Sequence, residues 1–201
     1  MATSRPRKRA YHHGDLAAAL LRTAGNILEK EGVEGLKLRA LARRAGVSHN
    51  APYRHFPQSE ALLAALAAEG FEALGEALRR AGAAGGLRAM GEAYVAFAIA
   101  RPQRFRLMFG GRIPLANHAR LRAVATKAFE ELAGALSASL PAAKDATDSS
   151  IAAWALVHGL AQLLLGKRLS GAAKRGRDDA TFVREVLSSI RFAAIPAQPG
   201  A

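Results

Sequence analysis

Residues 48 to 55, SHNAPYRH, place hydroxyl, imidazole, amide, phenol and guanidinium groups close together in the chain. Groups of these types can hydrogen-bond to base edges and to backbone phosphates in DNA. To reach the bases they must lie on a rigid element that fits the major groove, such as the second helix of a helix-turn-helix. The neighbouring sequence must then supply a first helix and a turn that hold this element in place.

The run from Leu36 to Phe56, LKLRALARRAGVSHNAPYRHF, has the pattern of such a motif. Leu38, Leu41 and Ala42 fall at helical spacing, so one face of the first helix is apolar. Gly46 stands where a left-handed residue commonly ends a helix. The pattern predicts a short helix, a glycine turn and a second short helix.

The second helix is expected to begin at Ser48, whose hydroxyl can cap its first turn. Pro52 lies close enough to the start to be tolerated. Tyr53 and Phe56 are expected to form the buried side of this helix. The exposed side then carries the groups that could meet DNA, which are His49, Asn50, Ala51, Arg54 and His55. An ordinary helical hairpin with a solvated face fits the same pattern and stays open as an alternative.

Basic charge is concentrated around this motif. The chain has 29 Lys and Arg against 16 Asp and Glu, a formal net charge of +13. Residues 1–56 hold 11 basic and 4 acidic side chains (net +7), and residues 57–201 hold 18 and 12 (net +6). Just over half of the excess therefore lies in just over a quarter of the chain. Such charge raises affinity for a phosphate backbone without specifying sequence.

Several kinds of chemistry lack the residues that they need. The chain of 201 residues contains no cysteine, which excludes disulfides, zinc–thiolate sites and cysteine nucleophiles. It shows no Ser-His-Asp set, paired-carboxylate site, phosphate-binding loop or HExxH motif, so we expect neither an enzyme nor a cofactor. His118 and His158 lack neighbours at metal-ligand spacing, so no metal site is expected.

The sequence also bears on the compartment. The N-terminus is rich in arginine and has no apolar stretch of the kind that a secretory signal needs. The longest apolar run, Ile151 to Gly166, is shorter than the ~20 residues that span a bilayer, and it contains His158 and Gln162. We expect this run to be a buried helix in a cytoplasmic protein that does not enter a membrane.

Hydrophobic periodicity predicts helices along nearly the whole chain and no strands. Asp15 is expected to cap a first helix that runs to about Lys30, and Ser59 is expected to cap a long fourth helix. Later helices are expected at 87–100, 104–109, 117–140, 148–169 and from Asp178 or Asp179 to Pro196, with a basic loop at 170–177. The sequence AGAAGG at 81–86 is expected to mark a domain boundary.

Three short N-terminal helices, the residues GVS..APY.HF, a capped long helix and an all-helical remainder resemble the tetracycline-repressor (TetR) family. The N-terminal resemblance covers roughly Tyr11 to Leu78. A second signature, Trp154, His158 and Gly159 in AWALVHGLAQ, resembles the C-terminal domain of one TetR subgroup. The resemblance implies a homodimeric transcriptional regulator, usually a repressor, that a small ligand releases from DNA.

The expected fold is therefore all-α, with a helix-turn-helix domain that a long helix joins to a helical ligand-binding and dimerisation domain. We expect a basic flexible arm at 1–13, the DNA-binding domain with its connecting helix at 14–78 (motif 37–56), the second domain at 79–195 and a tail at 196–201.

The resemblance also implies roles for individual residues near the motif. Tyr53 and His55 match phosphate-contacting positions, and His49, Asn50 and Ala51 match positions that face bases. The residues expected to bind DNA are Arg7, Lys8, Arg9, Lys37, Arg39, Ser48, His49, Asn50, Ala51, Tyr53, Arg54 and His55.

Two positions depart from the family pattern. Lys37 stands where a Ser or Thr cap is common, so the helix that follows is expected to lack that hydrogen bond. Gln58-Ser59-Glu60 lacks the lysine that is common at the start of the fourth helix, which removes one expected phosphate contact.

Control by a ligand requires a cavity, and binding to two half-sites requires a dimer. The residues expected to line an apolar pocket for a small organic effector are Tyr94, Phe97, Phe105, Met108, Phe109, Trp154, His158 and Gln162. The last two helices are expected to form a four-helix interface between two chains through Leu156, Leu160, Leu163, Val183, Leu187 and Ile190. Aromatic residues and methionines at helical spacing also fit a plain packed core.

Two other functions remain open. A constitutive or architectural DNA binder would bind with little sequence preference, strong salt dependence and no release by a ligand. A helical interaction protein with a vestigial DNA-binding head would keep its function after replacement of Tyr53 and His55 by alanine. The aromatic residues of the second domain favour the ligand-responsive regulator over both.

Overall fold

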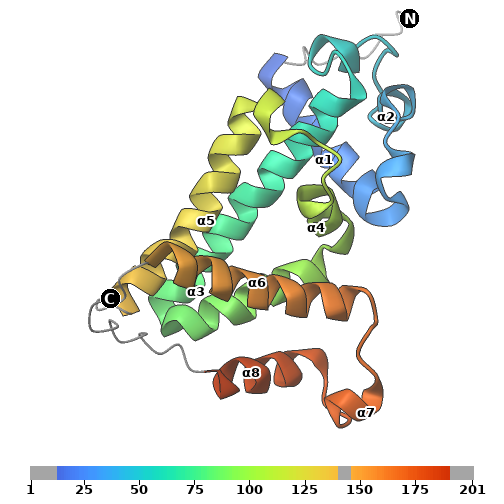
Figure 1. The fold of residues 1–201 in the computed structure, drawn as a ribbon. Helices are drawn as coiled ribbons and strands as arrows, with labels where there is room; N and C mark the ends of the chain where they lie inside the picture. The colour runs from blue at the N-terminus through green and yellow to red at the C-terminus, as the bar shows by residue number, and fades with distance from the viewer. Residues whose placement is uncertain (1–12, 140–145, 191–201) are drawn as a thin grey trace, which may run out of the picture. The chain divides into compact units, whose positions relative to one another are not determined.

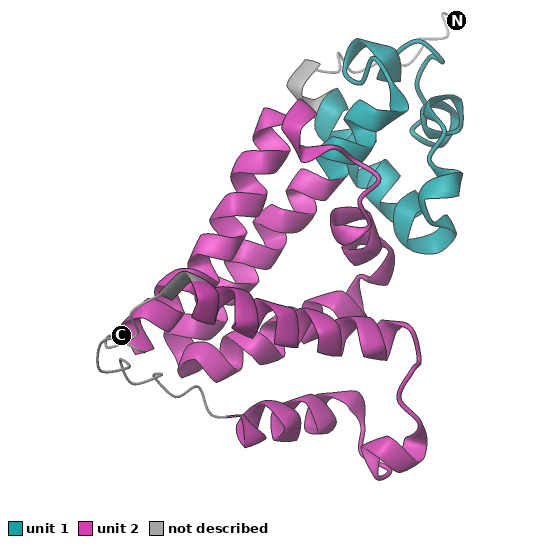
Figure 2. Cartoon of the chain, viewed as in Figure 1, with its two compact units in different colours: residues 1–66 teal, residues 67–201 magenta. Residues whose placement is uncertain are grey.

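A computed structural model describes residues 13–139 and 146–190 of the chain (Figure 1). Every regular element in these two ranges is a helix, which confirms the predicted all-α fold. The chain divides into two compact units, residues 1–66 and residues 67–201 (Figure 2). The predicted arm at 1–13 and the tail at 196–201 lie outside the described residues, apart from His13 at the start of the first helix.

Unit 1 begins with α1 (His13–Glu31), followed by the short 3₁₀ helix η1 (Val33–Gly35) and by α2 (Leu38–Arg44). The core face of α1 contains Leu20, Ala24, Ile27 and Leu28, which are all buried as predicted. The helix starts two residues before Asp15, so the prediction that Asp15 caps it is wrong. Gly32, with φ of 71°, turns the chain after α1.

The first half of the predicted motif has the expected conformation. Leu38, Leu41 and Ala42 of α2 are buried, because they occupy one face at helical spacing. Lys37 precedes the helix and makes no side-chain cap hydrogen bond, as its departure from the family pattern predicted. Gly46 adopts φ of 68°, a left-handed conformation that an L residue rarely takes, and so supplies the predicted turn.

The second half of the motif is shorter than predicted. Residues 49–51 form turns, and only Pro52–Arg54 form a helix, the 3₁₀ helix η2. Pro52 has no N–H to bond with the Ser48 carbonyl, which accepts from the Ala51 N–H at 2.9 Å instead. The residue at the N-cap of η2 is Ala51, and no side chain caps this helix. The prediction that Ser48 caps the second helix is therefore wrong.

The burial of this segment also differs from the prediction. Phe56 is buried as expected, but Tyr53 is 41% exposed and its predicted place in the core is wrong. Pro52 is buried instead. In the tighter 3₁₀ geometry, Pro52 and Phe56 rather than Tyr53 and Phe56 face the core.

The long helix α3 (Ser59–Ala100) starts in unit 1 and continues into unit 2. The sequence predicted that Ser59 precedes this helix and caps it, but Ser59 is the first residue of the helix itself. Two residues inside it are not helical, Gly85 (φ −153°, ψ 17°) and Gly86 (φ 67°, ψ −158°). The sequence AGAAGG therefore separates two helical segments by a kink, because Gly86 takes a left-handed φ that interrupts the helix. The domain boundary predicted at this sequence stays a prediction.

The remaining helices belong to unit 2 (Figure 2). They are α4 (Pro102–Phe109), the 3₁₀ helix η3 (Leu115–Asn117), α5 (Ala119–Ser139), α6 (Ala146–Leu165), α7 (Gly171–Lys174) and α8 (Asp179–Ser189). The helix α5 packs on α6 through a buried cluster of Leu132, Leu136 and Ala153. The end that was predicted for α5 at Pro141 lies outside the described residues.

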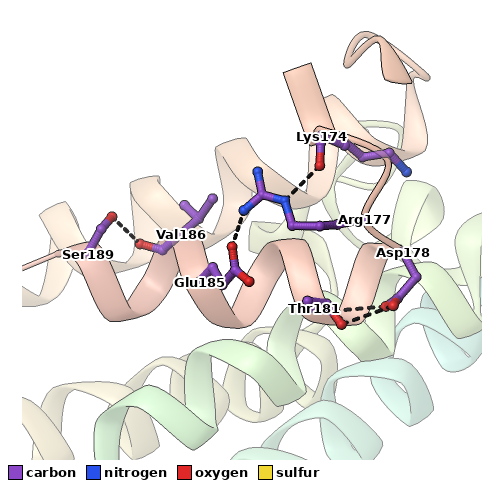
Figure 3. Close-up of polar contacts among 7 residues, drawn as sticks. All are labelled: Lys174, Arg177, Asp178, Thr181, Glu185, Val186 and Ser189. Carbon is purple, nitrogen blue, oxygen red and sulfur yellow. Dashed lines mark hydrogen bonds and ion pairs between the residues drawn. The ribbon is translucent and has the colours of Figure 1, made fainter. Parts of the chain in front are cut away.

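The connection from α6 to α8 holds a short helix that the sequence did not predict. Ser170 caps α7 by accepting from the Ala173 N–H at 3.1 Å. The helix α8 starts at Asp179, one of the two predicted starts, and Asp178 caps it by accepting from the N–H and the hydroxyl of Thr181, both at 2.9 Å (Figure 3). Arg177 donates to the Lys174 carbonyl at 2.7 Å and pairs with Glu185 of α8, so the start of α8 is fixed from both sides (Figure 3).

The apolar helix α6 is only partly covered in the single chain. Only 28% of the stretch from Asp148 to Leu165 is buried. Ile151 and Leu163 on this stretch are 49% and 43% exposed. The prediction that this helix is buried therefore fails for one chain on its own. This stretch is long and apolar enough to cross a membrane, but core helices of soluble proteins have the same length and composition.

Candidate DNA-binding segment and effector cavity

The residues predicted to bind DNA are accessible to solvent wherever the structure describes them. Ala51 and His55 are half-buried, and the others are exposed: Lys37, Arg39, Ser48, His49, Asn50, Tyr53 and Arg54. Arg7, Lys8 and Arg9 lie outside the described residues. The turns and η2 thus present imidazole, amide, phenol and guanidinium groups together on a short segment, and their contacts with DNA stay a prediction.

Backbone and ionic contacts hold this segment in unit 1. The Val47 N–H donates to the Ala42 carbonyl at 3.0 Å, which ties the turn to α2. Arg44 at the end of α2 pairs with Glu31 at the end of α1. The hydrogen bond with Arg44 holds the pKa of Glu31 below its usual value, so the pair is charged at neutral pH. Sequence reasoning missed this pair, because the two residues lie on different helices.

Unit 2 contains a cavity of about 460 Å³. Its walls come from α3, α4, α5 and α6 and from the segment that links α4 to α5. The predicted pocket residues that line it are Tyr94, Met108, Phe109 and Trp154. Its volume falls in the range of small-molecule sites, about 300–1,000 Å³. Ligand contact by these residues stays a prediction.

The other predicted pocket residues lie behind or away from the wall. Phe105 is fully buried and packs on Phe109 with ring centroids 4.7 Å apart and on His158 at 5.4 Å. Phe97 is buried beneath the guanidinium group of Arg101. Phe97, Phe105, His158 and Gln162 do not line the cavity.

Much of the wall consists of residues that sequence reasoning did not single out. The α5 residues that line the cavity are Leu121, Ala125, Thr126, Ala128, Phe129 and Leu132. Their spacing predicted an amphipathic helix but not the partner that its inner face would meet.

A chain of hydrogen bonds joins α3 to α6 beside the cavity, through two residues that line it, Tyr94 and Trp154, and through His158 and Gln162, which do not. The Trp154 indole N–H donates to the Tyr94 hydroxyl at 3.2 Å, and the same hydroxyl lies 2.9 Å from Nδ1 of His158. Nε2 of His158 lies 3.2 Å from the amide nitrogen of Gln162. We call these four side chains the Tyr94 relay. Trp154 and His158 share one face of α6, as their spacing of four predicted.

Both titratable members of the Tyr94 relay are neutral near pH 7. Burial raises the pKa of the Tyr94 hydroxyl above its usual range, and the hydrogen bond from Trp154 offsets only part of this effect. Burial also lowers the pKa of His158 below its usual value. The relay is therefore a set of neutral hydrogen-bonding groups.

Across residues 13–139 and 146–190, no three His, Asp or Glu side chains gather in a way that could hold a metal ion.

The residues predicted to form the dimer interface differ in exposure. Leu160 and Val183 are buried within the chain, whereas Leu163 is exposed. Leu156, Leu187 and Ile190 are half-buried. The part of α6 that carries Leu163 is therefore the more accessible part of the predicted interface.

Comparison with known proteins decides the family. Residues 20–66 match the family model described as "Bacterial regulatory proteins, tetR family", and residues 87–188 match "Tetracyclin repressor-like, C-terminal domain". The chain belongs to the TetR family. TetR-family regulators are DNA-binding proteins without catalytic activity. The two matches place the DNA-binding helix-turn-helix of this family in unit 1 and its helical C-terminal domain in unit 2.

Individual TetR relatives agree with this assignment. The chain is 51% identical over 49 residues to the tetracycline repressor protein class C of Escherichia coli, a match that covers 24% of this chain and only 22% of that protein. A protein of unknown function from Rhodococcus sp. RHA1 is 34% identical, with a TM-score of 0.77 over 90% of this chain and 96% of its own. AibR, solved in complex with isovaleryl coenzyme A and operator DNA, shares the fold at 17% identity, with a TM-score of 0.62 over 86% of this chain and 96% of its own.

Proposed function

We propose that this TetR-family protein is a transcriptional repressor that binds a near-palindromic operator as a homodimer and is released by a small organic effector. The observation that carries the proposal is the apolar cavity of about 460 Å³ in unit 2. A regulator without an effector has no need for such a space, and a tightly packed core would be more stable. The alternative of a constitutive or architectural DNA binder leaves the cavity without a role.

The homodimer is supported by the surface of α6. Its apolar residues Ile151 and Leu163 are exposed in the single chain, and covering them in a partner would remove apolar area from water. A two-fold dimer would present two DNA-binding segments to half-sites about 34–36 Å apart or a multiple of that distance. Two copies are needed because one short segment such as η2 covers too little DNA for a specific site.

The DNA contacts are proposed for the exposed residues of the recognition segment. Tyr53 and His55 would contact phosphates, while His49 and Asn50 would face bases. Lys37, which precedes α2, and Arg39 within α2 would add phosphate contacts. All of these side chains are exposed except His55, which is half-buried. Binding and release would take place in the cytoplasm, where the operator is.

The effector is proposed to be a small organic molecule rather than a metal or a coenzyme. AibR was solved with isovaleryl coenzyme A, but its likeness to this chain shows only the fold. The cavity here is lined by apolar side chains with few polar groups, which suits a compact apolar molecule. The Trp-His-Gly subgroup suggested by Trp154, His158 and Gly159 remains part of this proposal.

Selection of bound sequences from a random DNA pool tests the proposal. We expect an enriched near-palindrome with two half-sites, and binding that falls when an effector fills the cavity. The variant with Tyr53→Ala and His55→Ala should lose the enriched site. A pool that enriches no motif, together with binding that depends only on salt, would establish the architectural alternative.

A further inference from the structure

Among the residues that the structure describes, none that lines the cavity carries a charged side chain. These residues are aliphatic, aromatic, methionine or glycine, and their polar groups are the hydroxyls of Tyr94 and Thr126 and the indole nitrogen of Trp154. An ion that entered this space would lose its hydration without gaining a counter-charge from these walls, which is strongly unfavourable. The walls therefore select against carboxylates, phosphates and ammonium groups.

Hydrogen-bond directions in the Tyr94 relay leave one donor free. In the orientation that the structure gives the Gln162 amide, its nitrogen lies 3.2 Å from Nε2 of His158, and because an amide nitrogen only donates, Nε2 accepts from it. A neutral imidazole that accepts at Nε2 carries its proton at Nδ1. Nδ1 of His158 therefore donates to the Tyr94 hydroxyl across 2.9 Å.

The Tyr94 hydroxyl thus accepts two hydrogen bonds, one from His158 and one from Trp154 at 3.2 Å. Both lone pairs are used, and the O–H proton of Tyr94 has no acceptor within the relay. Tyr94 is only 3% exposed and lines the cavity, so an acceptor for that proton has to come from a molecule in the cavity. Because burial raises the pKa of the hydroxyl, the proton stays in place across the physiological pH range.

We propose that the cavity binds an uncharged, largely apolar molecule with one hydrogen-bond acceptor, such as a ketone, and that the Tyr94 hydroxyl donates to that acceptor. Trp154 and His158 position the hydroxyl by filling its two acceptor sites. The regulatory meaning of this site rests on the proposed function, because ligand binding matters to DNA only if the protein is ligand-responsive. The binding chemistry itself can be measured without DNA.

Three naphthalene probes of nearly equal size separate the chemical classes. The full chain, without DNA, is titrated in a calorimeter with 2-acetylnaphthalene (neutral, with an acceptor), 2-ethylnaphthalene (neutral, without one) and 2-naphthoate (anionic). The fluorescence of Trp154 gives a second readout, because it is the single tryptophan of the chain and it lines the cavity. We expect the ketone to bind about 5- to 10-fold more tightly than the hydrocarbon, the gain of one net hydrogen bond, and the carboxylate to bind most weakly.

Two variants locate the donor. Tyr94→Phe should weaken 2-acetylnaphthalene by about 5- to 10-fold and leave 2-ethylnaphthalene within about twofold, which also shows that the cavity is intact. Thr126→Val, which removes the other hydroxyl on the wall, should leave the preference for the ketone in place. The proposal is overturned if the carboxylate binds most tightly, if none of the probes binds, or if the ketone preference survives Tyr94→Phe or disappears in Thr126→Val.

Operator binding measured in parallel separates this inference from the proposed function. If the ketone binds through Tyr94 but the chain selects no operator, or the ketone leaves operator binding unchanged, the repressor proposal loses its support and the cavity assignment stands. If an operator is selected and an anionic compound releases it through the same cavity, the repressor proposal stands and the cavity assignment fails.

Discussion

The thioether of Met108 in α4 lies directly against Gly70 of α3. A Cβ atom added to Gly70 would fall 2.5 Å from the Met108 sulfur and 3.0 Å from its Cγ. The two helices are also joined by an ion pair between Arg104 and Glu69, with 3.3 Å between nitrogen and oxygen. Because Met108 also lines the cavity, the position of α4 on α3 determines part of the cavity wall.

Gly70→Ala should therefore disturb both packing and ligand binding. The new methyl group must displace Met108, and overpacking of this kind costs about 1–3 kcal/mol, the lower end being expected because methionine is flexible. We expect a lower melting temperature and weaker binding of 2-acetylnaphthalene. Gly134→Ala in α5 is the matched control, because a Cβ there meets nothing within 4 Å and gains about 0.5–1 kcal/mol of helix propensity. Equal stability of the two variants would show that Met108 and α4 can shift away from Gly70 without a cost in folding free energy.

The sequence was sufficient to predict the elements of the DNA-binding unit but not their exact geometry. The spacing of Leu38, Leu41 and Ala42 predicted α2, and Gly46 predicted the turn, because both depend on local rules. The same rules predicted a regular second helix where the structure has turns and η2. Pro52 removes one backbone donor, and the segment is too short for the remaining hydrogen bonds to restore an α-helix.

The cavity could be predicted only in part. The aromatic residues Tyr94, Phe109 and Trp154 stood out in the sequence, and all of them lie on its wall. Phe105 stood out equally but packs behind the wall, since periodicity gives the inward face of a helix and not the depth of each side chain. The contribution of α5 depends on which helix its apolar face meets, and that contact joins segments far apart in the sequence.

His158 should make the protein less stable in mild acid. Burial holds the pKa of His158 below the usual 6.5, so the unfolded chain binds a proton at this residue before the folded chain does. The free energy of unfolding then falls as pH drops below about 6.5, and the fall ends below the lowered folded pKa. Above about pH 6.5 His158 is neutral in both states, and its full contribution to the free energy of unfolding is present.

Denaturant unfolding between pH 7.5 and 5 measures this effect. His158→Gln should flatten the pH dependence relative to the parent chain, because the residue that gains the proton on unfolding is gone. His49→Gln, which replaces an exposed histidine of unit 1, is the control substitution. A curve for His158→Gln that parallels the parent curve would contradict the assignment.

Phosphate contacts and base contacts should respond differently to substitution. Arg39→Ala should weaken operator binding for all sequences and lower the slope of log affinity against log salt by about one. Asn50→Ala should instead relax the sequence preference at one position of each half-site. Fluorescence anisotropy at several salt concentrations measures both effects. Arg80→Ala, an exposed arginine of unit 2 that pairs with Glu76, removes the same charge and should keep the slope. A slope unchanged by Arg39→Ala would remove α2 from the DNA contacts.

Charge on the open face of α6 should separate the proposed dimer. Ile151 and Leu163 are 49% and 43% exposed in the single chain, so Ile151→Glu and Leu163→Glu should leave its fold intact. In a dimer that covers this face, each substitution would bury an unpaired carboxylate twice by symmetry, which is far more costly than exposure to water. Leu187→Glu and Ile190→Glu should act in the same direction but are less clean, because both side chains are half-buried already.

Sedimentation velocity on the α6 variants measures the assembly. We expect dimers for the parent chain and monomers for Ile151→Glu and Leu163→Glu, with operator affinity falling because each monomer holds one half-site. Leu115→Glu is the matched control, since Leu115 is 43% exposed but lies in η3, away from α6 and α8 in the sequence. Dimers that persist in both α6 variants would rule out this face, and monomers in the control would show that any added charge disrupts the assembly.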